Sequence, residues 1–349
     1  MSIRRIATLT RLSPATVSLA LQNNPKIPSA TRARVHAAAN QINYRPDAKV
    51  AELMSQVRHA ARATAAAAGA APTACLGVIS LYDTPRPWEK SLHLARMYEG
   101  MAARAAKLGY RLEPLWLRAP GMTPRRFRAI LDARGINALL CFGSPEIDAR
   151  FPPELDHYAI VTQGLSIATP LHCVINHAYS DTLRALNRAH ALGYRRPGLL
   201  LSEYEDIRGG RANAGAYFAW CEHHLGTPAI MPILRMTRID EKPLRAWLKR
   251  HAPDVIIIAH HQDALADFAR ALQRLGQRAP ADIGLIALTQ VLAGTPYSGF
   301  QENQRLMGER AVELLVSRIM NADFALPENP RIELVKSDWI EGKTLRPQQ

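Results

Sequence analysis

The residues best suited to specific contacts lie near the start of the chain, where small polar side chains alternate with methyl-bearing ones. Residues 13–19 read Ser-Pro-Ala-Thr-Val-Ser-Leu. Alanine and leucine side chains contact thymine methyl groups or read groove shape, and they do not pair with guanine edges. We therefore expect Ala15, Thr16 and Leu19 to read bases in a DNA groove.

Short helices are needed to present these side chains. Ser2 can cap a helix over residues 3–10. Ser13 followed by Pro14 is a second start signal, because serine accepts free N–H groups and proline fits the first helical turn. Ser29 starts a third helix. The gap of about three residues between the first two helices is typical of a helix-turn-helix, which places its second helix in the major groove.

Positive charge is concentrated in the same region. Residues 1–62 contain ten basic and two acidic residues, so they hold a net charge of +8 out of +14 for the whole chain. This positive charge would lie close to the phosphate backbone of bound DNA. The alternative is a small three-helix domain with a solvated basic face, which explains the charge but not the turn spacing and the caps.

The first 46 residues resemble the DNA-binding headpiece of the LacI/GalR family of bacterial transcription regulators. The matching residues are Ile3, Ile6, Ala7, Ser13, Thr16, Val17, Ser18, Leu21, Asn23, Thr31, Arg32, Val35, Ala38, Tyr44 and Pro46. Two positions depart from the family. Arg11 stands at the family's turn glycine, where positive φ disfavours arginine. Leu19 stands where the recognition helix usually has arginine, so the family's usual operator sequence is not expected.

An apolar stripe at helical spacing follows the headpiece. Val50, Leu53, Met54 and Val57 are spaced as on one helix face, which needs a packing partner. One alternative is packing on the headpiece of the same chain. The resemblance implies the other: a hinge helix that pairs with its dimer mate and inserts Leu53 into the minor groove as a wedge that bends the duplex.

The DNA-binding residues expected from the pattern and the resemblance together form one set. They are Ser2, Arg4, Ser13, Pro14, Ala15, Thr16, Ser18, Leu19, Asn23, Lys26, Thr31, Tyr44, Lys49 and Leu53.

From residue 75 onward, predicted strands and helices alternate, which indicates parallel sheets covered on both faces. The expected strands are residues 75–81, 111–117, 138–142, 159–163, 198–201, 229–234, 255–259, 283–288 and 332–336, the last ending the ordered part. The expected helices are residues 89–108, 124–134, 179–192, 213–225, 241–251, 263–275 and 302–320.

The predicted fold class is α + α/β, a helix-turn-helix headpiece followed by a two-lobed periplasmic-binding-protein-like α/β domain. The expected domains are the headpiece at 1–46, a hinge helix at 47–57, a linker at 58–74, and an effector-binding and dimerisation domain at 75–340. Its first lobe is expected to comprise 75–163 and 297–325, and its second 164–296 and 326–340.

The resemblance extends over nearly the whole chain. Residues 192–196 (LGYRR), 259–264 (AHHQDA) and 280–284 (PADIG) stand at three family segments, and the implied fold binds its ligand between two lobes. Where the family has ligand-binding carboxylates, this chain has His261 and the pair Thr289-Gln290. Carboxylates hold sugar hydroxyls by charge-assisted hydrogen bonds, so binding of a simple hexose in the family's manner is not expected.

The expected effector-binding residues are Asp83, Trp88, Asn176, Arg208, Arg211, His260, His261 and Gln290. This set holds more positive than negative charge, which favours a sugar acid or a carboxylate-bearing oligosaccharide over a neutral hexose. Trp88 is aromatic and could stack on a sugar face, with packing inside the fold as the alternative.

Several classes of protein are disfavoured. No run approaches eighteen apolar residues, and Ser2 is followed by helix signals, so neither a membrane span nor a secretion signal is expected. The four cysteines are far apart and form no CxxC pair, so neither a disulfide nor a metal site is expected. The chain lacks GxGxxG after a strand, GxxxxGK[ST], HExxH and GxSxG. We expect a cytoplasmic protein that is not an enzyme and has no cofactor.

These observations together predict a sequence-specific transcription regulator, in the first instance a repressor, controlled by a small ligand such as a sugar or sugar derivative. A homodimer with two headpieces predicts an operator that is an approximate palindrome of double-stranded DNA. The alternative is a ligand-independent or architectural DNA-binding protein with a degenerate cleft.

Overall fold

The computed structural model describes residues 3–21, 27–42, 44, 74–225, 230–260, 264–289 and 294–347. The chain forms two compact units. The first comprises Met1–Gln163, Ile167–Val174 and Gln304–Ile332, and the second Gly164–Ser166, Ile175–Asn303 and Glu333–Gln349. The expected hinge helix at 47–57 and nearly all of the expected linker lie outside the described residues.

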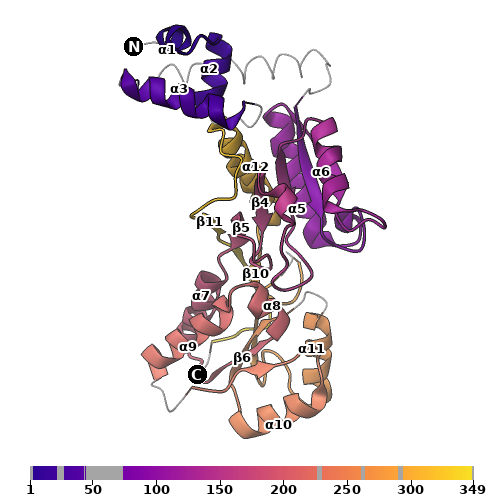
Figure 1. The fold of residues 1–349 in the computed structure, drawn as a ribbon. Coiled ribbons are helices and arrows are strands. Elements are labelled where there is room, and N and C mark those ends of the chain that lie inside the picture. Colours follow the sequence, from indigo (N-terminus) through magenta and orange to yellow (C-terminus); the bar gives the residue numbers. More distant parts are fainter. Residues whose placement is uncertain are drawn as a thin grey trace. The chain divides into compact units, whose positions relative to one another are not determined.

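The headpiece consists of three short helices, α1 (Ile3–Thr10), α2 (Pro14–Leu21) and α3 (Ser29–Gln41), as Figure 1 shows in indigo. Ile6, Val17 and Val35, one from each helix, are fully buried against one another, and small alanines fill the space between them. The expected three-helix arrangement is confirmed, and a small core of this kind leaves the polar faces of all three helices outward.

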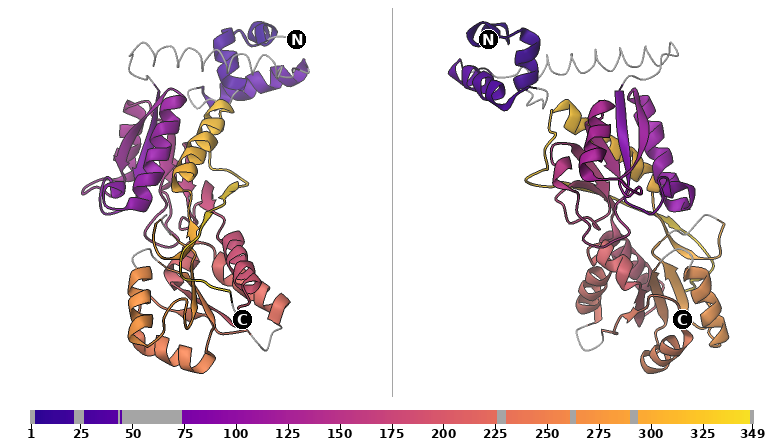
Figure 2. Two further views of the ribbon diagram at one scale, coloured as in Figure 1. Left: turned by 180° about the vertical axis from the view of Figure 1, so that it is seen from behind. Right: turned by 45° about the vertical axis from the view of Figure 1, so that its right-hand side comes forward.

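The first unit continues with a six-stranded sheet in the order β11-β5-β4-β3-β1-β2. Its strands are β1 (Ala74–Ser80), β2 (Tyr110–Trp116), β3 (Ala138–Cys141), β4 (Ala159–Gln163), β5 (His172–Asn176) and β11 (Ile332–Val335). β1 to β5 pair in parallel. Helix α6 (Pro124–Ala133) packs on one face through Phe127 and Leu131, and α5 (Leu92–Lys107) and α12 (Gln304–Met320) cover the other (Figure 2).

The second unit has its own six-stranded sheet, in the order β12-β10-β9-β8-β6-β7. Its strands are β6 (Pro197–Leu201), β7 (Leu234–Arg235), β8 (Val255–Ala259), β9 (Gly284–Ala287), β10 (Ser298–Gln301) and β12 (Asp338–Ile340). Its helices are α7 (Ala178–Ala191), α8 (Glu203–Arg208), α9 (Ala212–Leu225), α10 (Glu241–His251) and α11 (Ala264–Arg274). Leu199 and Leu201 face α7 and α9, whereas Leu200 faces α10 and α11, so both faces of β6 are buried.

Some expected elements differ from the structure. The strand expected at 229–234 is reduced to Leu234–Arg235, because Pro232 has no N–H to donate to a ladder. The helix expected from residue 89 begins at Leu92, since the Ser91 hydroxyl accepts the N–H of Leu94 and caps it. Residues 332–336 do not end the ordered part, because β12 follows and pairs antiparallel with β10.

The boundary between the expected lobes also needs correction. Residues 297–303 were expected in the first lobe, but β10 pairs with β9 and β12 and belongs to the second unit. Five further elements were not expected from the sequence. They are β5, β10, α8 and the single 3-10 turns Pro87–Glu89 and Pro153–Leu155.

Candidate functional site

Helix α2 presents small and apolar side chains on its exposed face. Its amino end is capped by Ser13, whose hydroxyl oxygen accepts the Thr16 N–H at 3.0 Å. Val17 and Ala20 are fully buried, whereas Pro14, Ala15 and Leu19 are exposed. Because residues 15 and 19 are four apart, they lie on the same helix face. This face can contact thymine methyls in a major groove, and its hydroxyls can reach base edges.

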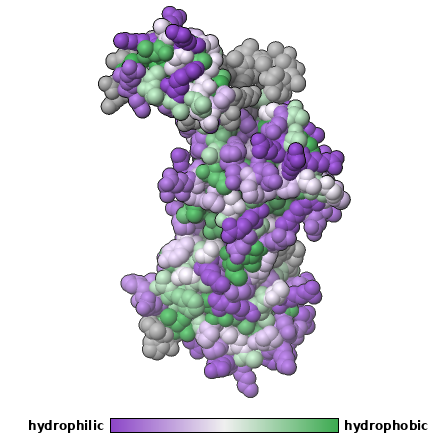
Figure 3. Space-filling model, in the orientation of Figure 1, coloured by the Kyte–Doolittle hydropathy of each residue, from purple (hydrophilic) through white to green (hydrophobic). Residues whose placement is uncertain are grey.

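Basic and polar groups flank α2. Arg4 and Arg5 on α1 and Arg34 on α3 are exposed, while Thr31 at the start of α3 is half-buried. Hydrophilic residues surround small apolar patches on the headpiece surface in Figure 3. The arginines can pair with phosphates, which fixes the register of the helix without reading sequence. Tyr44 is half-buried against the headpiece core, and its N–H donates to the Ala39 carbonyl at 2.9 Å.

The turn between α1 and α2 places an arginine in a left-handed conformation. Arg11 has φ 50°, as its position at a turn glycine of the family predicts. The Leu12 N–H donates to the Ala7 carbonyl at 3.0 Å and the Arg11 N–H to the Thr8 carbonyl at 3.3 Å. This pair of hydrogen bonds is a Schellman motif, which normally uses glycine at this position. The turn is therefore preserved at a cost in backbone strain.

Several expected site residues lie outside the described residues. They are Ser2, Asn23, Lys26, Lys49, Leu53, His261 and Gln290.

In the first unit, the two expected effector residues differ in exposure. Asp83 is exposed just after β1. Trp88 is buried, and its ring stacks on Tyr98 with centroids 4.3 Å apart and 3° between the planes. Phe142 lies against it at 5.5 Å. One face of the Trp88 indole is thus occupied within the fold.

Gln163, which the sequence did not single out, occupies the carboxyl end of β4. Its side chain is 3 % exposed, and neither the amide nitrogen nor the amide oxygen has a hydrogen-bond partner in the described part of the chain. A buried polar group without a partner costs about 1–3 kcal/mol, which a ligand hydroxyl could recover. Carboxyl ends of parallel strands are also where open α/β sheets bind ligands.

In the second unit, the two expected arginines are already paired with carboxylates. The Arg211 guanidinium donates to Glu203 at 3.0 Å, and Arg235 donates to the same carboxylate at 2.6 Å. Hydrogen bonds from Arg211 and Arg235 lower the pKa of Glu203 below its usual range. Arg208 lies 3.7 Å from Glu205 and over the Tyr204 ring. The positive charge counted from the sequence is therefore largely compensated.

Two other expected residues are Asn176, at the end of β5 just past the boundary between the units, and His260 in the second unit. The Asn176 side-chain amide donates to Glu302 at 3.2 Å. His260 follows β8 directly and is 7 % exposed, and its Nε2 lies 3.1 Å from the Met236 carbonyl oxygen. The carbonyl of His260 accepts the Thr289 hydroxyl at 2.7 Å, so the ends of β8 and β9 are tied together.

Asp206 is a second buried polar group that the sequence did not reveal. It lies on α8, 1 % exposed, and one carboxylate oxygen accepts the Ala214 N–H at 3.4 Å. The other oxygen has no partner among the described residues. Burial raises the pKa of this carboxyl group. A carboxylate here could bind a sugar hydroxyl, a role that sequence reasoning had assigned to residues beyond β8 and β9.

Neither a metal cluster nor a membrane-spanning helix is found where the structure is described. In those residues no three histidine, cysteine or acidic side chains come together as metal ligands would, and no helix is long and apolar enough to cross a membrane.

Comparisons with known proteins agree with this architecture. Residues 2–47 match the family described as bacterial regulatory proteins, lacI family, and residues 186–344 match the periplasmic binding protein-like domain. The HTH-type transcriptional regulator AglR of Rhizobium meliloti (strain 1021) is 24 % identical over 355 residues, which cover 96 % of this chain and 93 % of that protein.

Two solved structures share the fold over 99 % of both chains. The Lac repressor dimer bound to operator and the anti-inducer ONPF aligns with a TM-score of 0.57 at 17 % identity. The complex of the transcriptional regulator CelR with cellobiose aligns with a TM-score of 0.57 at 16 % identity.

A helix-turn-helix headpiece followed by two doubly wound α/β units defines a class of DNA-binding regulators with a periplasmic-binding-protein-like body. Residues 2–47 form a DNA-binding domain of the lacI family of bacterial regulatory proteins, and the chain combines it with a periplasmic binding protein-like domain at residues 186–344, the domain combination of LacI-type transcription regulators.

Proposed function

We propose that the protein is a repressor that binds a palindromic operator as a homodimer and responds to a small ligand. The observation that carries the DNA-binding proposal is the exposed face of α2, with Ala15 and Leu19 side by side and arginines on the neighbouring helices. Two copies related by a two-fold axis would present two such faces to two half-sites. A protein with this target acts in the cytoplasm of a bacterium.

Footprinting on operator DNA selected from a random pool tests this proposal. The expected result is protection of two half-sites related by an approximate dyad. A single asymmetric half-site would contradict the homodimer, and equal affinity for selected and random DNA would favour the architectural alternative.

We further propose that the ligand is a sugar or a sugar derivative. The support comes from two buried polar side chains, Gln163 and Asp206, which each leave side-chain atoms without hydrogen-bond partners in the described residues. Both residues lie at or just after the carboxyl end of a strand. CelR, a structural relative, is bound to cellobiose in its own crystal structure. Arg208 and Arg211 are already close to carboxylates, so these two arginines do not by themselves favour a sugar acid over a neutral sugar.

A thermal-shift screen of neutral sugars and sugar acids tests the ligand proposal. A ligand at 100 times its dissociation constant stabilises the native state by about 2.7 kcal/mol. The shift is expected to disappear in Gln163→Leu and to persist in Gln273→Leu, a control at an exposed position of α11. Absence of any stabilising sugar would support the ligand-independent alternative. A ligand controls DNA affinity only through different affinity for two arrangements of the protein.

A further inference from the structure

The second unit contains a cavity at the opposite edge of its sheet from α8 and His260. The cavity has a volume of about 570 Å³. Arg196 directly precedes β6, Asp254 directly precedes β8, and Asp282 lies just before β9, so the cavity borders the amino ends of these strands. It is separate from Arg208, Arg211 and His260, which follow the carboxyl ends of β6 and β8.

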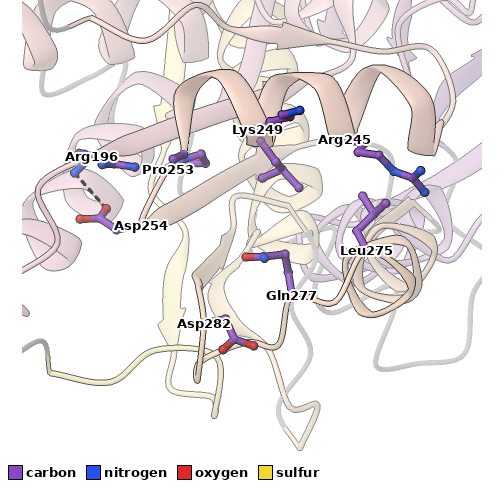
Figure 4. A pocket seen from close by; sticks show the side chains of 10 residues that line it. Arg196, Arg245, Lys249, Pro253, Asp254, Leu275, Gln277 and Asp282 are labelled. Atoms are coloured by element: carbon purple, nitrogen blue, oxygen red, sulfur yellow. Dashed lines mark hydrogen bonds between the residues drawn. The ribbon is translucent and has the colours of Figure 1, made fainter.

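The two carboxylates in the cavity wall are already satisfied. Asp254 accepts the backbone N–H of Arg195 at 2.6 Å and that of Arg196 at 2.9 Å, and Figure 4 shows the second of these bonds. Asp282 accepts three hydrogen bonds from Arg278, one from its backbone and two from its guanidinium, at 2.9, 2.9 and 3.3 Å. Asp282 is therefore neutralised by Arg278, whereas Asp254, held only by neutral backbone N–H groups, keeps its negative charge.

Three basic side chains in the wall have no such partner. Arg196, Arg245 and Lys249 make no ion pair or side-chain hydrogen bond to another residue of the described ranges. Arg245 and Lys249 are four residues apart on α10, so their side chains lie on one face of that helix, as Figure 4 shows. Because the three basic groups outnumber the one unpaired carboxylate of Asp254, the cavity wall keeps a net positive charge.

The remaining wall is apolar, with one amide. Leu248, Pro253 and Leu275 line it, with Pro253 near Asp254 and Leu275 near Arg245 at the other end (Figure 4), and Gln277 can both donate and accept hydrogen bonds. A volume of about 300–1,000 Å³ is typical of small-molecule sites, and here charged and apolar side chains line the cavity in similar measure. The organic part of a ligand would bury the leucines, and its anionic part would meet the basic groups.

We propose that this cavity binds a small organic phosphate of mononucleotide size. A phosphate monoester carries a charge of about −1.5 to −2 at pH 7 and three acceptor oxygens, which suits two adjacent cations better than a single carboxylate does. The phosphate lies between Arg245 and Lys249, Arg196 adds a third cation, and the apolar wall contacts the organic group. The site is independent of the proposed sugar ligand.

Calorimetric titration of the full chain with adenosine 5′-monophosphate tests this site, with inorganic phosphate as a second titrant. The pocket variant is Arg245→Gln/Lys249→Gln. The matched control is Lys242→Gln/Arg250→Gln, which removes the same charge from exposed positions of α10 outside the cavity. The nucleotide is expected to bind wild type and control alike and the pocket variant at least tenfold more weakly. Inorganic phosphate is expected to bind more weakly than the nucleotide.

Three results would overturn the proposal. The first is no binding of the nucleotide to the wild-type protein. The second is an equal loss in both double variants, which would reflect overall charge. The third is equal affinity for inorganic phosphate and the nucleotide, which would leave an unspecific anion site without a contribution from the apolar wall. Circular dichroism of both variants establishes that they fold.

Discussion

Gly308 of α12 lies so close to Met97 of α5 that a Cβ atom added at Gly308 would be 2.1 Å from the Met97 carbonyl oxygen. The contact is reciprocal along the same helix pair, since a Cβ at Gly100 would be 1.9 Å from the Arg305 carbonyl oxygen. Two glycines thus let the backbones of α5 and α12 approach on one face of the first sheet.

We expect Gly308→Ala to destabilise the protein by about 1–3 kcal/mol, the usual cost of forcing an extra methyl into a packed core. Urea unfolding measures the change. Gly215→Ala is the control, because Gly215 lies in α9 with nothing within 4 Å of an added Cβ. That change is expected to stabilise by about 0.5–1 kcal/mol, as alanine does in a helix. Equal effects of the two substitutions would exclude the close approach as their cause.

In the turn between α1 and α2, we expect replacement of Arg11 by glycine to stabilise the protein, whereas Gly308→Ala destabilises it. A non-glycine residue in the left-handed region costs roughly 1–2 kcal/mol, so Arg11→Gly should stabilise the headpiece by about 1 kcal/mol. Arg11→Ala removes the same charge but keeps the strain, and it should leave stability nearly unchanged. Hydrogen exchange of the α1 and α3 amides measures both. Equal exchange in the two variants would show that charge, and not the backbone, matters here.

How far the sequence predicted the fold depended on the length and periodicity of each element. Strands β4 and β8 and helix α10 agree with expectation to the residue, because continuous apolar runs and an Asp240 cap define their limits. α8 was missed because six mostly charged residues show no apolar period. β12 was missed because its three residues are stabilised by pairing with β10, which is distant in sequence.

The candidate sites also differ in how far the sequence could predict them. The outward face of α2 follows from local spacing and a cap, so sequence reasoning could find it. Gln163 and Asp206 became visible only through burial without partners, which depends on side chains from distant segments. The pairing of Arg211 with Glu203 also changes the charge that a ligand would meet, and no count of residues could reveal it.

We expect the free energy of unfolding to fall in mild acid because of His172. Burial first, and then Arg318 and Arg331, lower its pKa, while Asp323 opposes them weakly. Its Nδ1 accepts the Arg331 N–H at 2.8 Å. A folded-state pKa below the unfolded value of about 6.5 means that the unfolded chain binds the proton more tightly. The stability that neutral His172 provides is therefore present above that value and falls as pH drops through it toward the folded-state pKa.

We expect His172→Asn, which keeps an acceptor near the Arg331 N–H, to flatten the dependence of unfolding free energy on pH between about 7.5 and 5.5. The measurement is urea unfolding at several pH values. The exposed His157 supplies the control, and His157→Asn should leave the slope as it is in wild type. An unchanged slope in His172→Asn would remove this histidine from the acid response.

Leu19 should carry sequence information, because it is 36 % exposed on α2 next to Ala15. Leu19→Ala is expected to weaken operator binding by about 1 kcal/mol or more, the scale of one base contact, and to leave binding to random DNA nearly unchanged. Leu9→Ala, at a leucine that is 50 % exposed on α1, is the matched control. Gel-shift titrations at one fixed salt concentration compare them. Similar losses on both DNAs would show that Leu19 does not read bases.

Leu53 lies outside the described residues, and its role as a minor-groove wedge stays a prediction. A wedge that unstacks a base step is useful only where the duplex bends easily, so Leu53→Ala should weaken operator binding more than random binding. The loss should be a few kcal/mol at most, on the order of the cost of unstacking one step. Val57→Ala tests the neighbouring apolar position. If Leu53→Ala lowers affinity equally for operator and random DNA, the stripe at 50–57 packs on protein and does not enter the groove.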